Sequence, residues 1–357
     1  MWVATMLAAA AIRGAPTDPV GIGGANIAED CQFPGVVAIR AGETSCSGSM
    51  VHPRVMVTAA HCLADGVPDR VRFGEAYTPY EHRIDVERCE VYPAYLESDA
   101  AVDDFAFCVL TEPVDELAPI PLLAGCEVEL MQPGTVAVLV GFGIPAEGES
   151  YGRKHYGFTT VYARLGDGST VMIGDEGVNG CIGDSGGPAF VQLSDGTWRS
   201  VGVFSRGPIC GGGPSTYVVL AGRLAWIEEH SGFDLTPCYD DDGEWEASPE
   251  CAAFAADPRS SDGDWDHYCD GERRDPMPTC EPMQSASSSS SGGDASSSSS
   301  SSGAEDSSST GPSAADASEG CGCTAAGARS RGFLWVVWAF VAGYSARTCK
   351  RTRDRWQ

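Results

Sequence analysis

The sequence predicts a β-rich domain followed by an unstructured tail, and three observations lead to this prediction. Short apolar runs, such as residues 55–57 and the alternating stretch after Asp104, have the length and pattern of β-strands. A glycine-rich loop, CIGDSGGPAF at 181–190, surrounds a single serine. Beyond Thr236 the composition shifts to acidic residues and serine. The chain has 357 residues, which is enough for one such domain and additional segments.

The glycine-rich loop predicts a nucleophilic serine at Ser185. Glycine lets backbone amides approach a ligand closely and adopts torsion angles that a side chain forbids. Such a loop exposes the serine Oγ while nearby N–H groups point at a developing oxyanion, as acyl transfer requires. A serine hydroxyl is a weak nucleophile unless a histidine takes its proton, and that histidine needs a partner to fix its tautomer.

His61 and Asp104 are the candidates for these two partners. The strand at 55–57 is followed by the small residues 58–60, which let the chain turn and present His61 at its end. Asp104 precedes an apolar run, where a carboxylate beside an imidazole stays ionised through hydrogen bonds. Asp103 is the rival, but the register of the following strand favours Asp104. Each residue alone has an ordinary structural explanation, whereas the order His, Asp, Ser is informative.

Three motifs resemble those of the chymotrypsin/trypsin-like serine endopeptidases: TAAHC at 58–62, DFAF at 104–107 and GDSGGP at 183–188. Gly141 to Gly143 resemble the Gly-Trp-Gly segment of that family, and residues 217–229 resemble its closing strand and C-terminal helix. The resemblance covers about residues 20–236. It implies an all-β fold of two six-stranded antiparallel Greek-key barrels with a C-terminal helix, and a site in the cleft between the barrels.

The resemblance also implies an activity, namely hydrolysis of polypeptides through an acyl-enzyme, without a cofactor or a metal. His61 would be general base and then general acid, Asp104 would orient it, and Ser185 would be the nucleophile. The backbone amides of Gly183 and Ser185 would form the oxyanion hole. The alternative is a catalytically inactive relative that uses the same cleft to bind peptides.

Substrate contacts follow from the same resemblance. Asn179 would lie at the base of the primary specificity pocket, with Gly180, Gly207 and Ser215 along its walls, and the segment from Ser205 to Gly207 would pair with the substrate backbone. Because Asn179 carries no charge, we expect an open, uncharged pocket. Cleavage is then expected after uncharged residues, either medium-sized apolar ones or polar ones.

The activation route is left open by the sequence. Many members of the family are cut before an Ile-Val-Gly-Gly segment, and the new ammonium pairs with the aspartate beside the nucleophile, which is Asp184 here. The matching segment VGIGGAN at 20–26 places Val20 or Gly21 where a large apolar residue is expected. The nearest upstream basic residue, Arg13, is too early for a cut at that point.

Fifteen cysteines predict disulfide bonds and an oxidising, extracytoplasmic compartment. The resemblance pairs Cys46 with Cys62 and Cys181 with Cys210, and it places Cys89 and Cys108 on neighbouring strands. Cys31 with Cys126 would complete an even set, although spacing alone does not fix this pairing. Four further cysteines, at 238, 251, 269 and 280, suggest a small disulfide-bonded appendage.

Five segments are expected along the chain. They are a possible signal peptide or pro-segment at 1–19, the protease-like domain at 20–236, an acidic appendage at 237–283, a disordered serine-rich linker at 284–320 and a terminal segment at 321–357. Residues 238–320 contain nineteen Asp and Glu against three Arg, a net charge of −16 within the chain's −27. This acidity argues against nucleic acid as a partner, because a polyanion would be repelled.

The terminal segment combines Cys321-Gly322-Cys323, an apolar stretch at 332–346 and a basic end. It resembles the C-terminal sorting tags of myxobacterial surface proteins. The apolar stretch is short for a bilayer, which usually takes roughly twenty residues, but the basic residues behind it would hold it in the membrane during export. The expectation is a secreted or surface-attached monomer; a permanent short transmembrane anchor and a helix packed on the domain are the alternatives.

Overall fold

The computed structural model describes residues 22, 26–144, 151–239, 249–259 and 263–273. The expected leader at 1–19, the serine-rich linker at 284–320 and the terminal segment at 321–357 lie outside the described residues. Among the residues described, no helix is both long enough and apolar enough to cross a membrane.

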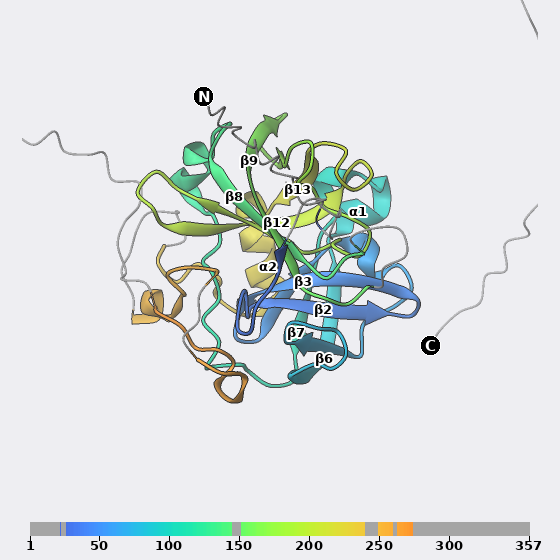
Figure 1. The fold of residues 1–357 in the computed structure, drawn as a ribbon, viewed down its shortest axis with the longest axis vertical. Coiled ribbons are helices and arrows are strands. Elements are labelled where there is room, and N and C mark those ends of the chain that lie inside the picture. The colour runs from blue at the N-terminus through green and yellow to red at the C-terminus, as the bar shows by residue number, and fades with distance from the viewer. Residues whose placement is uncertain (1–21, 23–25, 145–150, 240–248, 260–262, 274–357) are drawn as a thin grey trace, which may run out of the picture. The chain divides into compact units, whose positions relative to one another are not determined.

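Two closed, six-stranded antiparallel barrels form the described body, which confirms the predicted fold (Figure 1). In pairing order, the N-terminal barrel consists of β2 (Val36–Ala41), β3 (Thr44–His52), β4 (Val55–Thr58), β7 (Ala106–Leu110), β6 (His82–Val91) and β5 (Arg70–Phe73). The C-terminal barrel consists of β8 (Val136–Gly141), β9 (His155–Leu165), β10 (Thr170–Ile173), β13 (Ser215–Val219), β12 (Trp198–Arg206) and β11 (Pro188–Gln192), and β11 pairs with β8 to close it. The short strand β1 (Asn26–Ile27) pairs with β9.

Helices are few and lie in the connections. The two α-helices are α1 (Pro93–Ser98) and α2 (Leu224–Ser231). The 3₁₀ turns are η1 (Ala60–Leu63), η2 (Ala101–Asp103), η3 (Gly125–Leu130), η4 (Ala221–Arg223), η5 (Pro249–Ala253) and η6 (Trp265–His267). Helix α2 follows the last strand of the C-terminal barrel, yet Trp226 packs edge-on against Phe107 of β7, with ring centroids 5.5 Å apart. The helix that ends the protease-like domain therefore packs against the N-terminal barrel.

Alternation of side chains along the strands builds the two cores. In β9, buried residues alternate with exposed ones from Gly157 to Tyr162, as expected for a strand with one face inside a barrel. Each barrel encloses its own apolar cluster. A third cluster contains residues of both barrels and of α2, among them Val57, Phe105, Val203 and Ile227. This shared cluster holds the barrels together, so loops from both meet at a common cleft.

The disulfide bonds differ from expectation at one position. The structure joins Cys46 to Cys62, Cys89 to Cys108 and Cys181 to Cys210. The expected bond between Cys31 and Cys126 is wrong, because Cys31 is bonded to Cys269, 238 residues away; Cys126 is disulfide-bonded as well. The physical reason is that residues 263–273 pack against the segment around Cys31, which brings Cys269 within bonding distance.

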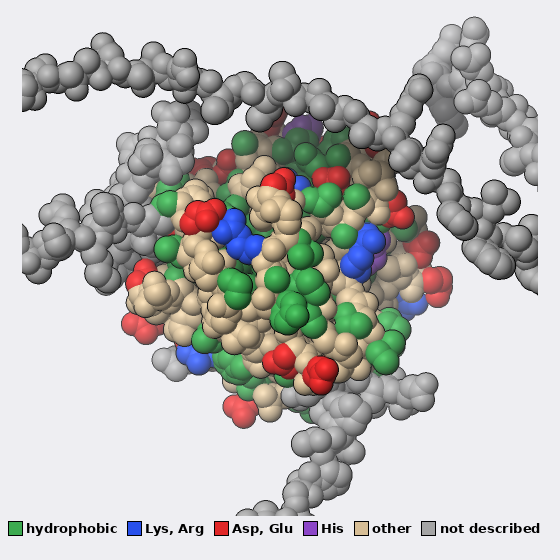
Figure 2. All heavy atoms as spheres, turned by 90° about the horizontal axis from the view of Figure 1, so that it is seen from above, with side chains coloured by type: hydrophobic (Ala, Val, Ile, Leu, Met, Phe, Trp, Pro, Cys, Tyr) green, Lys and Arg blue, Asp and Glu red, His purple; other side chains and the backbone are tan. Residues whose placement is uncertain are grey.

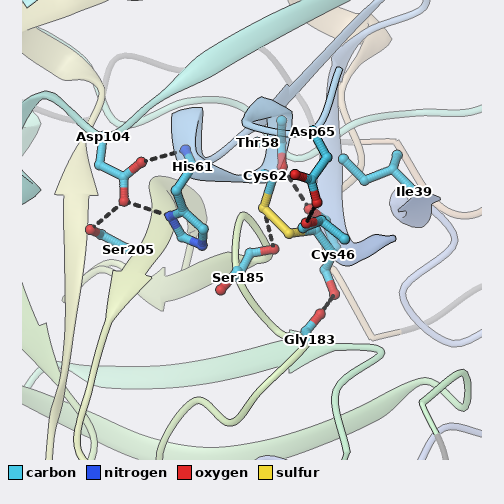
Figure 3. Close-up of a disulfide and its surroundings, with 12 residues drawn as sticks. Ile39, Cys46, Thr58, His61, Cys62, Asp65, Asp104, Gly183, Ser185 and Ser205 are labelled. Atoms are coloured by element: carbon cyan, nitrogen blue, oxygen red, sulfur yellow. Dashed lines mark hydrogen bonds and ion pairs between the residues drawn. A yellow bond between two sulfur atoms is a disulfide. The ribbon is translucent and has the colours of Figure 1, made fainter. Parts of the chain in front are cut away.

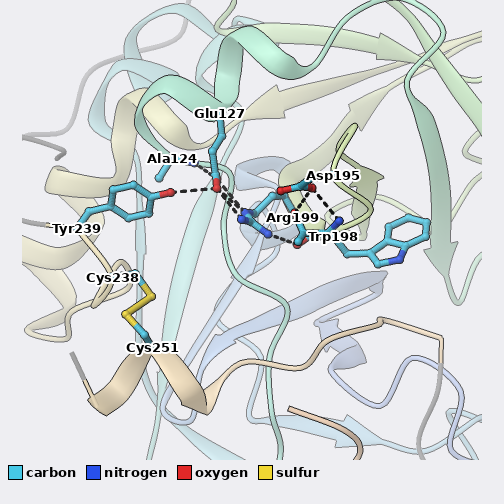
Figure 4. A network of polar contacts seen from close by, with 9 residues as sticks. Ala124, Glu127, Asp195, Trp198, Arg199, Cys238, Tyr239 and Cys251 are labelled. Atoms are coloured by element: carbon cyan, nitrogen blue, oxygen red, sulfur yellow. Dashed lines mark hydrogen bonds and ion pairs between the residues drawn. A yellow bond between two sulfur atoms is a disulfide. The ribbon is translucent and has the colours of Figure 1, made fainter. Parts of the chain in front are cut away.

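Residues beyond Thr236 pack first against the C-terminal barrel (Figure 4). The Tyr239 hydroxyl donates a 2.9 Å hydrogen bond to Glu127, whose fully buried carboxylate pairs with Arg199 at 2.6 Å. The Cys238–Cys251 bond lies next to this network. Because an unpaired charge is costly to bury, the three side chains form a mutually dependent anchor for this part of the chain.

Residues 263–273 pack against the N-terminal barrel. The Trp265 indole donates to Glu75, with Nε1 2.9 Å from Oε2, and the ring of Tyr268 stacks on His82 with centroids 4.4 Å apart. Trp265 also covers Lys154, whose Nζ lies 5.5 Å from the indole centroid. The expected acidic appendage thus contributes side chains to the packing of the barrels, and we call residues 263–273 with the Cys31–Cys269 bond the clasp.

Charged side chains are scattered over the surface in the view of Figure 2, among hydrophobic and neutral ones. On this face neither sign gathers into a broad field. Fields from exposed charges are screened within about 10 Å at ordinary ionic strength, so each charged residue acts mainly on the groups close to it.

Candidate active site

His61 is held at the end of β4 by a short turn and a disulfide (Figure 3). The chain leaves β4 at Thr58 and enters η1 at Ala60, so His61 occupies the second position of this 3₁₀ turn. The bond from Cys62 to Cys46 fixes the turn to β3. The imidazole keeps 32% of its side-chain surface exposed, so one edge of the ring remains accessible from the cleft.

Asp104 binds the other edge of His61. Its Oδ2 lies 2.8 Å from Nδ1 of the imidazole, and its Oδ1 accepts the backbone N–H of His61 at 3.0 Å. Ser205 donates a third hydrogen bond to Oδ2 at 2.6 Å. With Nδ1 facing a carboxylate, the tautomer that carries the proton on Nδ1 is favoured, which leaves Nε2 as the free acceptor.

The Asp104 carboxylate is 1% exposed and still favours the ionised form. Burial alone would raise its pKa, but the hydrogen bonds and attraction from His61, together with the hydrogen bond from Ser205, outweigh burial and lower the pKa. Asp103, the rival residue, instead lies 3.6 Å from Arg223. The structure therefore places Asp104, and not Asp103, beside the histidine.

The loop that carries Ser185 is tied to the other barrel by Ser47 of β3. The backbone N–H of Ser47 donates to the Ser185 carbonyl at 2.8 Å, and its Oγ donates to the Gly183 carbonyl at 3.0 Å. The same Oγ accepts the Phe142 N–H at 2.9 Å. Sequence reasoning missed Ser47, because a serine inside a strand carries no signal of its role before the barrels are placed together.

The amides of Gly183 and Ser185 are both available as donors. Gly183 has φ +94°, in the region that favours glycine, and this torsion shapes the turn before the serine. Among the described residues, neither amide donates to a protein acceptor. Within the same part of the chain, no hydrogen bond joins Ser185 Oγ to His61 Nε2, although Cys62 Sγ next to the histidine lies 3.6 Å from the Ser185 carbonyl. Both amides are thus without a protein acceptor in the described part of the chain, and Ser185 lies near His61 (Figure 3).

A cluster of Cys46, His61 and Cys62 brings two sulfurs and an imidazole within 4.8 Å of one another. Both sulfurs are joined in one disulfide bond. A disulfide offers no thiolate, and thiolates are what zinc and related metals bind at such clusters. The two cysteines of the cluster therefore form a disulfide bond that fixes the histidine turn, and they do not make a metal centre.

Asp184, next to the serine, is buried beneath the loop. Its carboxylate accepts the Gly143 N–H at 2.7 Å and the Cys181 N–H at 2.9 Å. Burial raises its pKa to about 6, although backbone hydrogen bonds from Cys181, Gly143 and Ile22 act in the opposite direction. Ile22 is itself 1% exposed and packs in the core of the C-terminal barrel, whereas Val20 and Gly21 lie outside the described residues.

The raised pKa of Asp184 predicts that stability falls as pH rises from about 4 to about 6. At a pH between 3.8, its ordinary pKa, and about 6, Asp184 is ionised in the unfolded chain but still protonated in the folded chain. A rise in pH across this window therefore favours the unfolded chain and lowers the free energy of unfolding. Urea unfolding of both proteins measures this effect. Between about pH 4 and pH 7, the free energy of unfolding of Asp184→Asn should rise by roughly 2–3 kcal/mol relative to that of wild type. A change of opposite sign would mean that the folded chain stabilises the carboxylate, as a cation beside it would.

The polar residues expected to line the specificity pocket are buried and hydrogen-bonded. Asn179 is fully buried, and its amide is used by the neighbouring loop: Nδ2 donates to the Ile209 carbonyl at 3.1 Å and Oδ1 accepts the Gly211 N–H at 2.5 Å. Ser215 is also fully buried, and its Oγ accepts the Gly180 N–H at 2.9 Å. The base of the site is thus uncharged, with its polar groups largely satisfied.

The two glycine walls are backed by other side chains. A Cβ at Gly207 would lie 2.6 Å from Ser215 Oγ, and a Cβ at Gly180 would lie 2.7 Å from the ring of Phe204. The Ser215 hydroxyl and the Phe204 ring thus lie close to the two glycines, and an open, uncharged pocket stays a prediction. Phe204 was missed by sequence reasoning, since an aromatic residue in a buried strand is ordinarily part of a core.

Comparisons with known proteins agree with the fold. The family model described as Trypsin matches residues 22–227. Among curated relatives, the tryptase of Mus musculus is 31% identical over 246 residues, covering 59% of this chain and 88% of the tryptase. Vitamin K-dependent protein C of Rattus norvegicus is 31% identical over 53% of this chain, which spans only 46% of that protein. An inactive CLIP domain-containing serine protease, A28 of Anopheles gambiae, is 29% identical over 57% of this chain and 62% of its own length.

Proposed function

The chain belongs to the trypsin family of serine proteases, and on that premise we propose that it is a serine endopeptidase with Ser185, His61 and Asp104 as its catalytic residues. The observation that carries the proposal is the 2.8 Å contact between His61 Nδ1 and a buried, ionised Asp104. This contact leaves Nε2 free to accept a proton on the side of the cleft where Ser185 lies.

The proposed reaction begins when Ser185 Oγ attacks the carbonyl carbon of the scissile bond and His61 Nε2 takes the hydroxyl proton. The carbonyl oxygen becomes an oxyanion, which accepts hydrogen bonds from the amides of Gly183 and Ser185. His61 then protonates the leaving amine, and an acyl-enzyme remains on Ser185. Water, deprotonated by the same imidazole, hydrolyses the acyl-enzyme and restores the serine. These steps use only side chains and amides of the protein and need no cofactor.

Substrate would bind as an added strand along the segment from Ser205 to Gly207. Pairing between β11 and β12 ends at Val203, and Phe204 still bonds to Gly186 and Gly187. Beyond Phe204, the strand partner of Arg206 among the described residues is Thr216 of β13. An extended peptide can pair with such a free edge through main-chain hydrogen bonds. The residue before the scissile bond, P1, would then enter the pocket bounded by Gly180, Gly207 and Ser215.

The uncharged base of the site supports a preference for uncharged P1 residues, and Ser215 beside Gly207 would favour small ones such as alanine. Replacing Ser215 with glycine removes the hydroxymethyl group beside Gly207, and we expect kcat/KM for leucine at P1, relative to alanine, to rise about 10-fold. Ser215→Thr adds a methyl group at the same place and should lower this ratio. The measurement is hydrolysis of peptides that differ only at P1; a ratio that moves in the same direction in both variants would contradict the proposed pocket.

Labelling with a fluorophosphonate tests the proposed activity directly, because the reagent reacts with an activated serine. A single adduct on Ser185 in the folded chain, absent after heat denaturation, supports the protease. A second function, peptide binding without hydrolysis, is favoured by one observation: among the described residues Ser185 Oγ is not hydrogen-bonded to His61. A folded, processed chain that binds peptides but takes no label would establish this alternative.

The setting of the enzyme is proposed from its disulfides and its sequence. Five disulfide bonds join described cysteines, which suits an oxidising compartment. We propose an extracytoplasmic monomer, secreted or attached to the cell surface by the segment at 321–357. Detection of the protein in cell-surface fractions, compared with a chain that ends at 320, tests the attachment.

A further inference from the structure

Arg206 is the residue between Ser205 and Gly207 on the free edge of β12. Its neighbours on both sides belong to the site: Ser205 donates to Asp104, and Gly207 contacts Ser215. The Arg206 side chain is exposed. On the proposed function, on which this inference rests, a peptide paired with this edge passes directly beside the Arg206 guanidinium.

The proposed substrate pairing decides which part of the peptide meets Arg206. The segment after the nucleophile is hydrogen-bonded to β12, because the Gly186 N–H donates to the Phe204 carbonyl at 2.8 Å. Two residues further, Arg206 pairs with Thr216 of β13. On the proposed function P1 enters the pocket, and the peptide N-terminal to P1, namely P2 to P4, runs along the segment that contains Arg206.

Most N–H groups of the Arg206 guanidinium have no hydrogen-bond acceptor among the described residues. Its one hydrogen bond in the described part of the chain runs from Nη2 to the Asp99 carbonyl at 3.3 Å, at the end of α1. No carboxylate of the described residues lies within 4.0 Å of it. A guanidinium carries five N–H donors in a fixed fork, so most of them have no acceptor in this part of the chain.

The nearby acidic groups are engaged elsewhere. Asp104 is held by His61 and Ser205, Asp103 pairs with Arg223 at 3.6 Å, and the Asp99 side chain is hydrogen-bonded to Tyr95. Among the described residues, Arg206 is thus an exposed cation without a carboxylate partner, in a protein whose net charge is −27. A carboxylate of the substrate would pair with this guanidinium.

We propose that Arg206 determines specificity by binding an acidic side chain of the substrate at one of the positions P2 to P4. The guanidinium fork matches a carboxylate in two-point hydrogen bonding, and a charge-assisted bond of this kind is about twice as strong as a neutral one. The substrate class is therefore a polypeptide with Asp or Glu shortly before a small, uncharged P1 residue. An aromatic side chain stacked on the guanidinium is the competing possibility and is distinguished by the test below.

The test uses the full chain and peptides with alanine at P1 in which P2, P3 or P4 is Glu or Gln. At one position we expect kcat/KM for Glu to exceed that for Gln by about 3- to 10-fold, the range for a partly exposed charge pair. The ratio should fall to about 1 in Arg206→Gln and below 1 in Arg206→Glu, where Lys becomes the favoured residue. Raising NaCl from about 0.05 M to about 0.5 M should reduce the wild-type ratio.

Arg83→Gln is the matched control, because Arg83 is an exposed arginine on β6 whose guanidinium donates to Tyr80. The Glu-to-Gln ratio should be unchanged in this variant. Equal rates for Glu and Gln at all three positions, an unchanged ratio in Arg206→Gln, or a preference for aromatic residues would each overturn the assignment of Arg206. Fluorophosphonate labelling of every variant separates these outcomes from failure of the proposed function, in which no peptide is cleaved and no label is taken up.

Discussion

Replacing Ser185 with alanine is expected to lower kcat/KM by about 10⁵- to 10⁶-fold and to abolish fluorophosphonate labelling. The physical reason is that no other hydroxyl of the site can form the acyl-enzyme: Ser205 is bonded to Asp104, and Ser47 is bonded between Gly183 and Phe142. Hydrolysis of a peptide with alanine at P1 and the intact mass of the labelled protein measure the two effects.

The fold of the Ser185→Ala variant should be unchanged. The backbone carbonyl of Ser185 keeps its 2.8 Å hydrogen bond from the Ser47 N–H. Ser200→Ala is the matched control, since Ser200 is a buried serine of the same barrel whose Oγ has no partner among the described residues. The control should retain full activity and labelling. Peptide hydrolysis that survives in Ser185→Ala would contradict the proposed nucleophile.

The short motifs allowed much of the fold to be predicted, because each motif marks a junction between strands. The turn after β4 carries His61, the start of β7 follows Asp104, and the loop before β11 carries Ser185. The two-barrel arrangement itself was implied by the family resemblance of these motifs, because the same three residue types meet on unrelated folds as well. Local sequence was sufficient here because small residues, apolar alternation and glycine act within a few positions of one another.

Properties that depend on packing between distant segments were not predicted. The sequence showed that Asn179 is uncharged, but it did not show that the side-chain amide is hydrogen-bonded to the backbone of the loop at 209–211. It did not show that Ser215 Oγ accepts the Gly180 N–H, or that the Phe204 ring lies beside Gly180. Nor could spacing alone reveal that Cys31 pairs across 238 residues, because connectivity is set by three-dimensional proximity.

Removing the Cys31–Cys269 bond by a double replacement with serine is expected to lower the free energy of unfolding by about 3–5 kcal/mol. The bond closes a loop of 238 residues, and in the chain-entropy account a longer loop restricts the unfolded chain more strongly. Guanidinium unfolding of the two proteins, both non-reduced, measures the difference. The active site lies elsewhere, so fluorophosphonate labelling of the folded variant should match wild type.

The Cys238–Cys251 bond provides the matched comparison, because it joins residues only 13 positions apart in the same C-terminal segment. If loop entropy is the main cause, removal of this bond should lower the free energy of unfolding by about 2–3 kcal/mol less than removal of the Cys31–Cys269 bond does. Packing adds to the effect at Cys31, since the next two carbonyls, of Gln32 and Phe33, accept hydrogen bonds from the fully buried Lys154 ammonium. Burial already lowers the pKa of Lys154 to about 8, so loosening this segment would leave a poorly solvated cation with fewer acceptors. Equal losses for the two disulfide variants would contradict the clasp as a structural element of the protease domain, and would leave residues 263–273 as a segment that merely covers the barrel.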